Sequence, residues 1–429
     1  MEPWLISAAA KRPERPALIT GRGELSYAEL AVAARRAADG LRRRGVSEGD
    51  RVALALPAGR AFAAALHGTW LLGAIAVPVD LRLGDSERAR RMQGVAAVVD
   101  TPLEAQDGQD APGVAVTVDP AATATLMFTS GTTSEPRPVE LTYGNWLAAA
   151  LGSAVALGLD QHERWLCPMP LAHVGGLSIL VRSTVYATTV VLHERFETAV
   201  ALDALMSERE RITLVSLVPT MLARLLDAGL RRPPALRWAL LGGGPIPPAL
   251  LERAEQAGVP VAPSYGMTEA CSQIATHGWP LPGVDVRLAA DGELLVRGAT
   301  VAPAALSADG WLHTGDLAEF GGGGRLRIIG RKSDTIVSGG ENVAPAEVEA
   351  VLLSHPAVAD AAVHARVDEE WGEAVVATVV ARDGSALDPN DLRAFCAARL
   401  AGFKVPKAIA FADELPRTAS GKLLRRKLD

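Results

Sequence analysis

Cysteine is scarce in this chain, and its placement excludes two kinds of stabilising site. The three residues, Cys167, Cys271 and Cys396, stand far apart and form no C-x-x-C pair. An odd, scattered set is typical neither of a disulfide framework nor of a structural zinc site. We therefore expect buried thiols in a reducing compartment.

An excess of basic charge is also absent. The 429 residues include 43 Lys and Arg against 49 Asp and Glu, which gives a formal net charge of −6. A general nucleic-acid binder needs a basic face for its phosphate contacts, so we expect no nucleic-acid partner. Apolar residues make up 49% of the chain and charged residues 21%, a balance that predicts a folded globular protein.

No stretch is apolar enough to predict a membrane span. The most apolar region, residues 61–79, is interrupted by polar residues, glycines and a proline, and it predicts a buried helix followed by a strand. The first residues, Met-Glu-Pro-Trp-Leu-Ile-Ser, begin acidic and are only briefly apolar, unlike a signal peptide. We expect a cytoplasmic protein with no membrane span.

The first half of the chain alternates predicted strands with predicted helices. Ser26 and Glu29 form a capping-box pattern at the start of a helix that ends near residue 44. Strands are predicted at residues 51–56, 74–78, 95–99, 165–169, 189–192, 212–217 and 238–241. This alternation indicates an α/β fold with a parallel sheet and helices on both faces. Ligands of such sheets lie beyond the carboxyl ends of the strands.

The pattern changes near residue 283. Short strands are predicted at 284–288, 292–296 and 326–329, and the glycine run at 321–324 predicts a tight turn in an antiparallel sheet. The last block contains predicted helices at 345–354 and 389–400 and predicted strands at 358–365 and 374–381. This block is large enough to fold as an α+β domain, and a chain of this length is expected to form two or three domains.

A cluster of hydroxyl side chains follows the short apolar run at residues 126–128. Thr129, Ser130, Thr132 and Thr133 surround Gly131 in consecutive positions. Backbone amides and hydroxyls in such a loop can surround the oxygens of a polyphosphate without fixed charges. A plain turn rich in Ser and Thr is the alternative, because most such clusters are turns.

Further motifs follow this loop along the chain. They are Ser264-Tyr-Gly-Met-Thr-Glu269, His313-Thr-Gly-Asp316, Gly330-Arg-Lys-Ser-Asp334 and Pro416-Arg-Thr-Ala-Ser-Gly-Lys422. Together with residues 129–133 they resemble the signature motifs of the adenylate-forming superfamily, which includes acyl-CoA synthetases, peptide-synthetase adenylation domains and luciferases. The resemblance extends from about residue 25 to the end of the chain, and the ordered set is far more specific than any single motif.

The resemblance implies an enzyme that uses ATP and Mg²⁺ to convert a small-molecule carboxylic acid into an acyl-adenylate and then passes the acyl group to coenzyme A. It implies an N-terminal domain over residues 1–330, with layered, mostly parallel sheets, helices and a small antiparallel β subdomain. It also implies a hinge at residues 331–334, which include Lys332, Ser333 and Asp334, and a small mobile α+β C-terminal domain over residues 335–429. Rotation about the hinge would deliver Lys422 for adenylation and then withdraw it.

By the same resemblance, site residues can be assigned. Glu269 would hold Mg²⁺, which binds through few carboxylates plus phosphates, and Tyr265 would stack on adenine. Asp316 would accept hydrogen bonds from the ribose hydroxyls, and Arg331 would orient ribose and phosphate. Lys422 would be catalytic, stabilising the negative charge that builds on the transferring phosphoryl group. The other residues assigned to ATP or AMP are Thr129, Ser130, Gly131, Thr132, Thr133, Arg137, Gly242, Gly243, Gly244, Gly266, Met267 and Thr268.

Each assignment has a plainer alternative. The glycines at 242–244 suit the close approach of a flat base, but a simple turn would also use them. Thr268 and Glu269 could start a helix, Asp316 could be a solvated turn residue, and Lys422 could belong to a solvated basic terminus.

The phosphate loop departs from the usual family continuation Gly-x-Pro-Lys-Gly. Ser134 and Pro138 stand where glycine is usual, and Arg137 replaces the lysine. Arginine keeps the charge and adds a fork that can grip phosphate oxygens. We expect a stiffer loop with slower motion and retained activity.

Residues 165–196 bear on the identity of the acid. Their His-Val-Gly-Gly-Leu-Ser-Ile-Leu and Arg-Ser segments look like the o-succinylbenzoate–CoA ligases of menaquinone biosynthesis. The acid would be contacted by His173, Arg182, Gly243 and Gly266, and His173 would gate or line the acyl pocket unless it is a buried structural histidine. Arg182 lies in an apolar run, where an unpaired charge is costly, so it could face the substrate, pair with an acid or emerge at the helix surface.

The sequence leaves other acids and acceptors open. A medium-chain or aryl acyl-CoA ligase would share every nucleotide motif, and a stand-alone adenylation domain would load a carrier protein. A non-catalytic nucleotide-binding relative is disfavoured, because Glu269, Asp316 and Lys422 are all retained. The oligomeric state is also open, with a homodimer as one alternative.

Overall fold

Residues 1–103, 117–129, 137–382, 384–385, 387–417 and 423–428 are described by the structure, a computed structural model of the chain. They form two compact units. The first comprises Met1–Gly243, Ala254–Asp285 and Val296–Leu312, and the second Gly244–Arg253, Val286–Leu295 and His313–Asp429. The α/β class expected from the sequence is confirmed, whereas the hinge at residues 331–334 stays a prediction.

The first unit is built mainly around a large sheet. In the described part of the chain its nine strands are β1 (Pro16–Thr20), β2 (Gly23–Ser26), β8 (Arg164–Cys167), β9 (Thr189–Leu192), β10 (Leu214–Leu217), β11 (Trp238–Leu241), β12 (Val261–Met267), β13 (Ser272–Thr276) and β14 (Trp279–Pro280). Their order is β14-β13-β12-β11-β10-β8-β9-β1-β2. All pairs from β12 to β1 are parallel, and the outer pairs are antiparallel. The carboxyl ends of β10, β11 and β12 therefore meet at one edge.

A second sheet of the first unit carries the predicted phosphate loop. Its described strands are β3 (Arg51–Leu54), β4 (Ile75–Pro78), β5 (Ala97–Val99), β6 (Thr123–Thr129) and β7 (Arg137–Thr142). They are arranged in the order β5-β3-β4-β6-β7, parallel except for the last pair. The sequence pattern did not predict β7. It contains Pro138, which lacks a backbone donor, and it lies at the edge of the sheet, where proline is tolerated.

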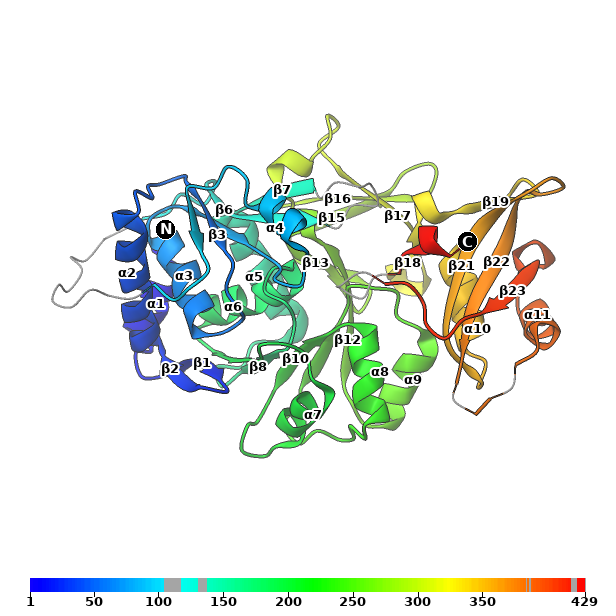
Figure 1. Cartoon of the computed structure of the whole chain (residues 1–429), viewed down its shortest axis with the longest axis horizontal. Coiled ribbons are helices and arrows are strands. Elements are labelled where there is room, and N and C mark those ends of the chain that lie inside the picture. The colour runs from blue at the N-terminus through cyan, green and yellow to red at the C-terminus, as the bar shows by residue number, and fades with distance from the viewer. Residues whose placement is uncertain (104–116, 130–136, 383, 386, 418–422, 429) are drawn as a thin grey trace. The chain divides into compact units, whose positions relative to one another are not determined.

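The helices shown in Figure 1 confirm most of the predicted pattern. They are α1 (Trp4–Lys11), α2 (Tyr27–Arg43), α3 (Arg60–Leu71), α4 (Asp85–Arg91), α5 (Tyr143–Leu157), α6 (Val174–Tyr186), α7 (Thr198–Met206), α8 (Pro219–Asp227) and α9 (Pro248–Gln256). The predicted capping box is present at the start of α2, since Ser26 and Glu29 each bind the backbone of the other. As predicted, α3 is buried and is followed by β4. Within the described residues, no helix is long and apolar enough to cross a membrane.

The second unit combines two sheets. One contains β15 (Val284–Leu288), β16 (Glu293–Gly298), β17 (Leu312–Phe320) and β18 (Leu326–Arg331), and the predicted glycine turn joins the antiparallel strands β17 and β18. The other contains β19 (Ile336–Ser338), β20 (Glu341–Val343), β21 (Val358–Asp368), β22 (Gly372–Ala381) and β23 (Ala408–Phe411). Helices α10 (Pro345–Leu353) and α11 (Pro389–Ala397) pack beside this second sheet (Figure 1). Their shared core includes Val348, Leu352, Val363, Val379 and Leu392.

Candidate active site

The predicted phosphate loop starts and ends on a strand hairpin. Strand β6 ends at Thr129 and β7 begins at Arg137, and these residues are cross-strand partners. The Thr129 hydroxyl donates to the Arg137 carbonyl oxygen at 3.4 Å. Ser130, Gly131, Thr132 and Thr133 lie outside the described residues, so their phosphate contacts stay predictions. The hairpin brings the two ends of the loop together at one edge of the sheet.

The predicted adenine wall lies where β11 and β12 end side by side. Gly243 follows β11 with a φ of +80°, a conformation that favours glycine. On the neighbouring strand, a Cβ at Gly266 would lie 1.6 Å from the carbonyl oxygen of Ser272. A side chain is excluded by space at Gly266 and strained by the backbone conformation at Gly243, and a flat base can approach such bare backbone closely. Gly242 extends β11, and Gly244, the first residue of the second unit, is exposed.

The predicted magnesium residue, Glu269, lies in a short 3-10 turn, Thr268–Ala270, between β12 and β13. Its backbone oxygen accepts a hydrogen bond from the Ala302 N–H at 2.8 Å. The turn ends at Cys271, whose φ of +51° is unusual for a residue with a side chain. A short helical turn does start at Thr268, as the plainer alternative for this segment expects, but no side-chain hydrogen bond caps it. The half-buried Glu269 is therefore held by backbone contacts.

A single carboxylate suits a magnesium ion that arrives with ATP. Among the described residues, no group of three or more His, Cys, Asp or Glu is arranged to hold a metal ion. Mg²⁺ typically uses one or two carboxylates and takes its other ligands from phosphates and water. Glu269 fits this pattern as one protein ligand. Its metal role, like the roles of Tyr265, Met267 and Thr268 beside it, stays a prediction.

The predicted ribose residue, Asp316, is paired with the predicted phosphate arginine. Asp316 on β17 and Arg331 on β18 are cross-strand partners, and Arg331 Nε lies 2.8 Å from Asp316 Oδ1. Arg331 Nη1 also donates to the Thr314 carbonyl oxygen at 3.1 Å. Asp316 is only 5% exposed, so the alternative of a solvated turn residue is wrong. The Asp316 carboxylate is therefore held in place by a cross-strand ion pair.

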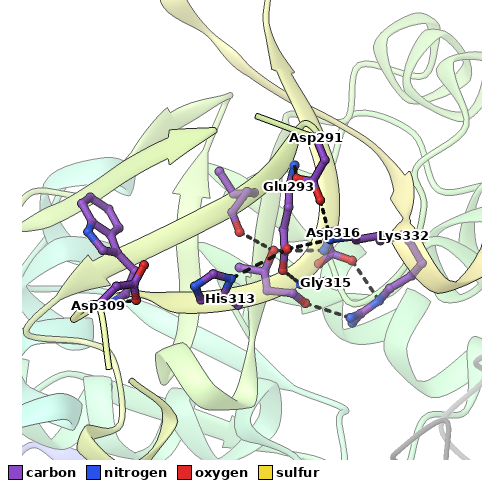
Figure 2. Close-up of polar contacts among 11 residues, drawn as sticks. Asp291, Glu293, Asp309, His313, Gly315, Asp316 and Lys332 are labelled. Carbon is purple, nitrogen blue, oxygen red and sulfur yellow. Dashed lines mark hydrogen bonds and ion pairs between the residues drawn. The ribbon is translucent and has the colours of Figure 1, made fainter. Parts of the chain in front are cut away.

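The predicted hinge residue Lys332 is bound by two acids that sequence reasoning missed. Figure 2 shows Asp291 and Glu293 directed toward Lys332, whose Nζ lies 3.2 Å from Glu293 Oε2. Glu293 also accepts a hydrogen bond from the Gly315 N–H at 2.9 Å, next to Asp316. The hydrogen bonds to Asp291 and Glu293 raise the pKa of Lys332. The hydrogen bond from Lys332 in turn lowers the pKa of Asp291. Glu293 therefore connects the predicted hinge lysine to strand β17 at the residue before Asp316.

His173 is held by a second ion pair that the sequence did not indicate. It precedes α6, and its Nε2 lies 3.1 Å from Arg82 Nη2 and 3.5 Å from Asp80 Oδ2. Arg82 binds Asp80 through two nitrogens, at 2.8 and 2.6 Å. Because a guanidinium only donates, neutral His173 accepts from Arg82 through Nε2, whereas a protonated ring would donate to Asp80. His173 is half-buried and contacts charged groups, so the alternative that it is a fully buried structural histidine is wrong.

The electrostatics of Asp80 follow from this arrangement. Burial alone would raise the pKa of Asp80, but hydrogen bonds from Arg82 and His173 hold it well below its ordinary value. The carboxylate is therefore charged at every physiological pH. It gives Arg82 a permanent counter-ion beside His173.

Arg182 lies in a different setting. It lies on α6 with only 1% of the residue exposed, so the alternative that its side chain emerges at the helix surface is wrong. Its Nε and Nη2 atoms have no hydrogen-bond partner, and it forms no ion pair within the part of the chain that the structure describes. Its guanidinium carbon lies 5.6 Å from the centre of the Trp165 ring. Burial lowers the pKa of Arg182, yet arginine stays protonated, so a buried cation is left without an anion.

Lys422 lies outside the described residues, but the base of its loop is described. Arg417 and Leu423 form an isolated β-bridge, and the Leu424 N–H donates to the Pro416 carbonyl oxygen at 2.8 Å. The catalytic assignment of Lys422 stays a prediction. Ser333 and Asp334 form a 3-10 turn with Lys332, and the hinge role of all three also stays a prediction.

The chain belongs to the AMP-binding enzyme family. The family model for the AMP-binding enzyme matches residues 5–99 and 94–304, and the model for the AMP-binding enzyme C-terminal domain matches residues 347–422. The adenylate-forming resemblance is thereby confirmed, and the chain is an AMP-forming acid–CoA ligase by class.

Its relatives narrow the class further. The 2-succinylbenzoate–CoA ligase of Bacillus licheniformis is 39% identical over 99% of this chain and 98% of the relative. The o-succinylbenzoate CoA synthetase of Bacillus subtilis, solved with the acyl-adenylate intermediate OSB-AMP, has a TM-score of 0.91 and 38% identity over 100% of this chain and 98% of that one. The same synthetase in complex with ATP and a magnesium ion has a TM-score of 0.89 and 37% identity over 100% and 99% of the two chains.

Proposed function

We propose that this enzyme activates o-succinylbenzoate with ATP, as an acyl-adenylate, and transfers the acyl group to coenzyme A in menaquinone biosynthesis. High identity to ligases of that name, over nearly the whole of both chains, supports the substrate. The structural observation that carries the proposal is Arg182. A buried guanidinium without an anion is unfavourable, and the second carboxylate of a dicarboxylic substrate would be the partner that none of the described residues supplies.

The proposed roles form one reaction. The carboxylate of the acid attacks the α-phosphorus of ATP, pyrophosphate leaves, and the CoA thiolate then attacks the acyl carbon and releases AMP. Glu269 holds Mg²⁺, which neutralises charge on the phosphate oxygens when bound. Asp316 and Arg331 orient the ribose and phosphates, and the acid arrives already ionised, so His173 lines the acyl pocket and is not needed as a base.

Lys422 stabilises the negative charge that develops on the phosphoryl group during adenylation. We therefore expect Lys422→Ala to abolish acyl-adenylate formation, while thioester formation from synthetic acyl-adenylate is largely retained. Pyrophosphate release reports the first step, and thioester formation monitored by chromatography reports the second. An equal loss in both steps would contradict the assigned role.

The substrate is tested by CoA-dependent release of AMP across a panel of acids that includes o-succinylbenzoate, medium-chain fatty acids and aryl acids. We expect o-succinylbenzoate to have the highest kcat/KM. No turnover of this acid, together with robust turnover of another, would contradict the proposal. Replacing CoA with a phosphopantetheinylated carrier protein in the same assay tests the acceptor. A cytoplasmic location and a homodimer stay predictions.

A further inference from the structure

Arg425 connects several elements of the second unit. Its Nε donates to the Val363 carbonyl oxygen on β21 at 3.1 Å. Its Nη2 contacts both carboxylate oxygens of Glu349 on α10, at 2.7 and 2.9 Å. Its Nη1 donates to Asp334 Oδ2 at 2.9 Å. Each guanidinium nitrogen thus binds a different segment, and one of these segments is the predicted hinge.

Arg425 matters for the proposed reaction because it lies three residues after Lys422 in the sequence. It directly follows Leu424, whose N–H closes the base of the loop that bears Lys422. Leu423 and Leu428 on either side pack with Leu415 in a small apolar cluster. Arg425 is therefore fixed both by packing and by its hydrogen bonds, directly after the base of the lysine loop.

The two acids that bind Arg425, Glu349 and Asp334, differ in how deeply they are buried. Glu349 is only 6% exposed and also accepts a hydrogen bond from the Val363 N–H at 2.8 Å. Burial raises the pKa of Glu349, and Arg425 opposes this rise, so this contact stabilises the fold. Asp334 is more exposed, with 26% of its side chain accessible, and it also accepts a hydrogen bond from the neighbouring Ser333 hydroxyl at 3.1 Å. The bond to Asp334 is not needed to compensate a deeply buried charge.

We propose that the Asp334–Arg425 ion pair is a positioning contact for adenylation. It fixes the described residues that directly follow Lys422, Leu423 and Leu424, to the predicted hinge residue within the second unit. This inference rests on the proposed function, because it assumes that Lys422 acts in the adenylation step. Arg425 acts through Lys422 and touches no substrate in this proposal.

The test removes only the hinge contact. Asp334→Asn keeps the size of the side chain and leaves the bonds of Arg425 to Glu349 and Val363 in place. We expect the rate constant for adenylate formation from o-succinylbenzoate to fall about tenfold, with KM for ATP unchanged within about twofold, because transition-state positioning and not ground-state binding is lost. Thioester formation from synthetic acyl-adenylate should stay within about twofold of the wild-type rate.

Two further variants separate positioning from folding. Asp334→Glu retains the charge and should restore part of the adenylation rate. Arg425→Lys disturbs the contact to Asp334 together with those to Glu349 and Val363, so combining it with Asp334→Asn should make adenylation no slower than Arg425→Lys alone. The matched control is Lys404→Ala, which removes an ion pair to Glu347 on the same helix α10 without touching the hinge. It should leave both steps within about twofold of wild type.

Unchanged adenylation in Asp334→Asn, or an equal loss in both steps, would overturn the positioning role. Additive losses in the double variant would overturn it as well. If the wild-type enzyme formed no adenylate from any acid in the panel, the proposed function would fall together with this inference. A normal wild-type rate with an unaffected Asp334→Asn would refute the inference alone.

Discussion

Two arginines of the first unit, Arg82 and Arg182, are surrounded in opposite ways. Arg82 has 41% of its side chain exposed, although Asp80 binds it through two nitrogens. Arg182 is 1% exposed, and its Nε and Nη2 atoms have no hydrogen-bond partner in the described part of the chain. The accessible cation has a built-in counter-ion, whereas the buried cation has none among the residues that the structure describes.

The difference separates structural from ligand-binding roles. An ion pair that is complete without ligand can fix a neighbouring side chain, as Arg82 does for His173. A buried charge without a partner is costly to the fold and is retained where a ligand supplies the missing anion. If this reasoning is right, substitutions at the two arginines have different consequences for stability and activity.

The largest effect is expected for Arg182→Met. We expect kcat/KM for o-succinylbenzoate to fall about 100-fold to 1,000-fold, since the second carboxylate would enter an apolar site without a partner. The melting temperature should be unchanged or higher, because an unpaired buried charge is replaced by an apolar side chain. Steady-state kinetics and calorimetry measure the two quantities.

A substrate control sharpens this prediction. A mono-acid analogue that lacks the non-activated carboxylate should lose little kcat/KM on going from wild type to Arg182→Met. An equal loss for the dicarboxylate and the analogue would mean that Arg182 does not recognise the second carboxylate. A marked fall in melting temperature would mean that the fold itself supplies its partner.

His67 shows how a buried base responds when it can release its proton. It is 4% exposed on α3, and burial lowers its pKa to about 4. As the pH falls below about 6.5, the unfolded chain binds a proton that the folded state refuses until about pH 4, so stability decreases by up to about 3 kcal/mol across this window. We expect His67→Gln to remove this part of the pH dependence. Urea unfolding at several pH values measures it, and equal slopes for both proteins would contradict the assignment.

A smaller effect is expected for Asp80→Asn, which leaves Arg82 without its counter-ion. We expect the free energy of unfolding at pH 7 to fall by about 2 kcal/mol, the cost of losing a charge-assisted hydrogen-bonded partner. Because the pKa of Asp80 lies below its ordinary value, its contribution is complete above about pH 4 and is lost only as the pH falls further.

The same variant should affect activity less than Arg182→Met does. We expect kcat/KM to fall about tenfold, because His173 keeps its place before α6 but loses one of its two charged neighbours. The difference in stability between wild type and Asp80→Asn should be equal at pH 7 and pH 5. A difference that grew between these values would indicate that another group, and not the Asp80 carboxylate, carries the effect.

Local features of this protein could be read from the sequence, whereas contacts between distant segments could not. The capping box of α2 and the glycine turn before β18 depend on neighbouring residues and were predicted correctly. Arg82 meets His173 across 91 positions, and Lys332 meets Glu293 across 39. Such pairs depend on how β4 and α6, or β16 and β18, are arranged, and no local pattern encodes that arrangement.

Arg182 illustrates the same limit within the site. The apolar run around it predicted that a charge there would need explanation, but three alternatives remained until the burial of α6 was known. Asp316 is similar, since a Thr-Gly-Asp segment is typical of a turn, and only the pairing with Arg331 on β18 shows a buried strand residue. Residue type indicated the chemistry, and tertiary packing decided the setting.

The smallest effect is expected for an arginine that is neither buried nor among the residues assigned to the site. Arg51 on β3 pairs with Glu140 on β7 at 3.1 Å, and both side chains are more than 40% exposed. Arg51→Met should change the free energy of unfolding by less than about 1 kcal/mol, because exposed ion pairs gain little over hydration, and kcat/KM should stay within about twofold of wild type. The substitution is the same as at Arg182, so it controls for the loss of positive charge. A loss of activity comparable to that of Arg182→Met would show that net charge, and not burial without a partner, governs the response.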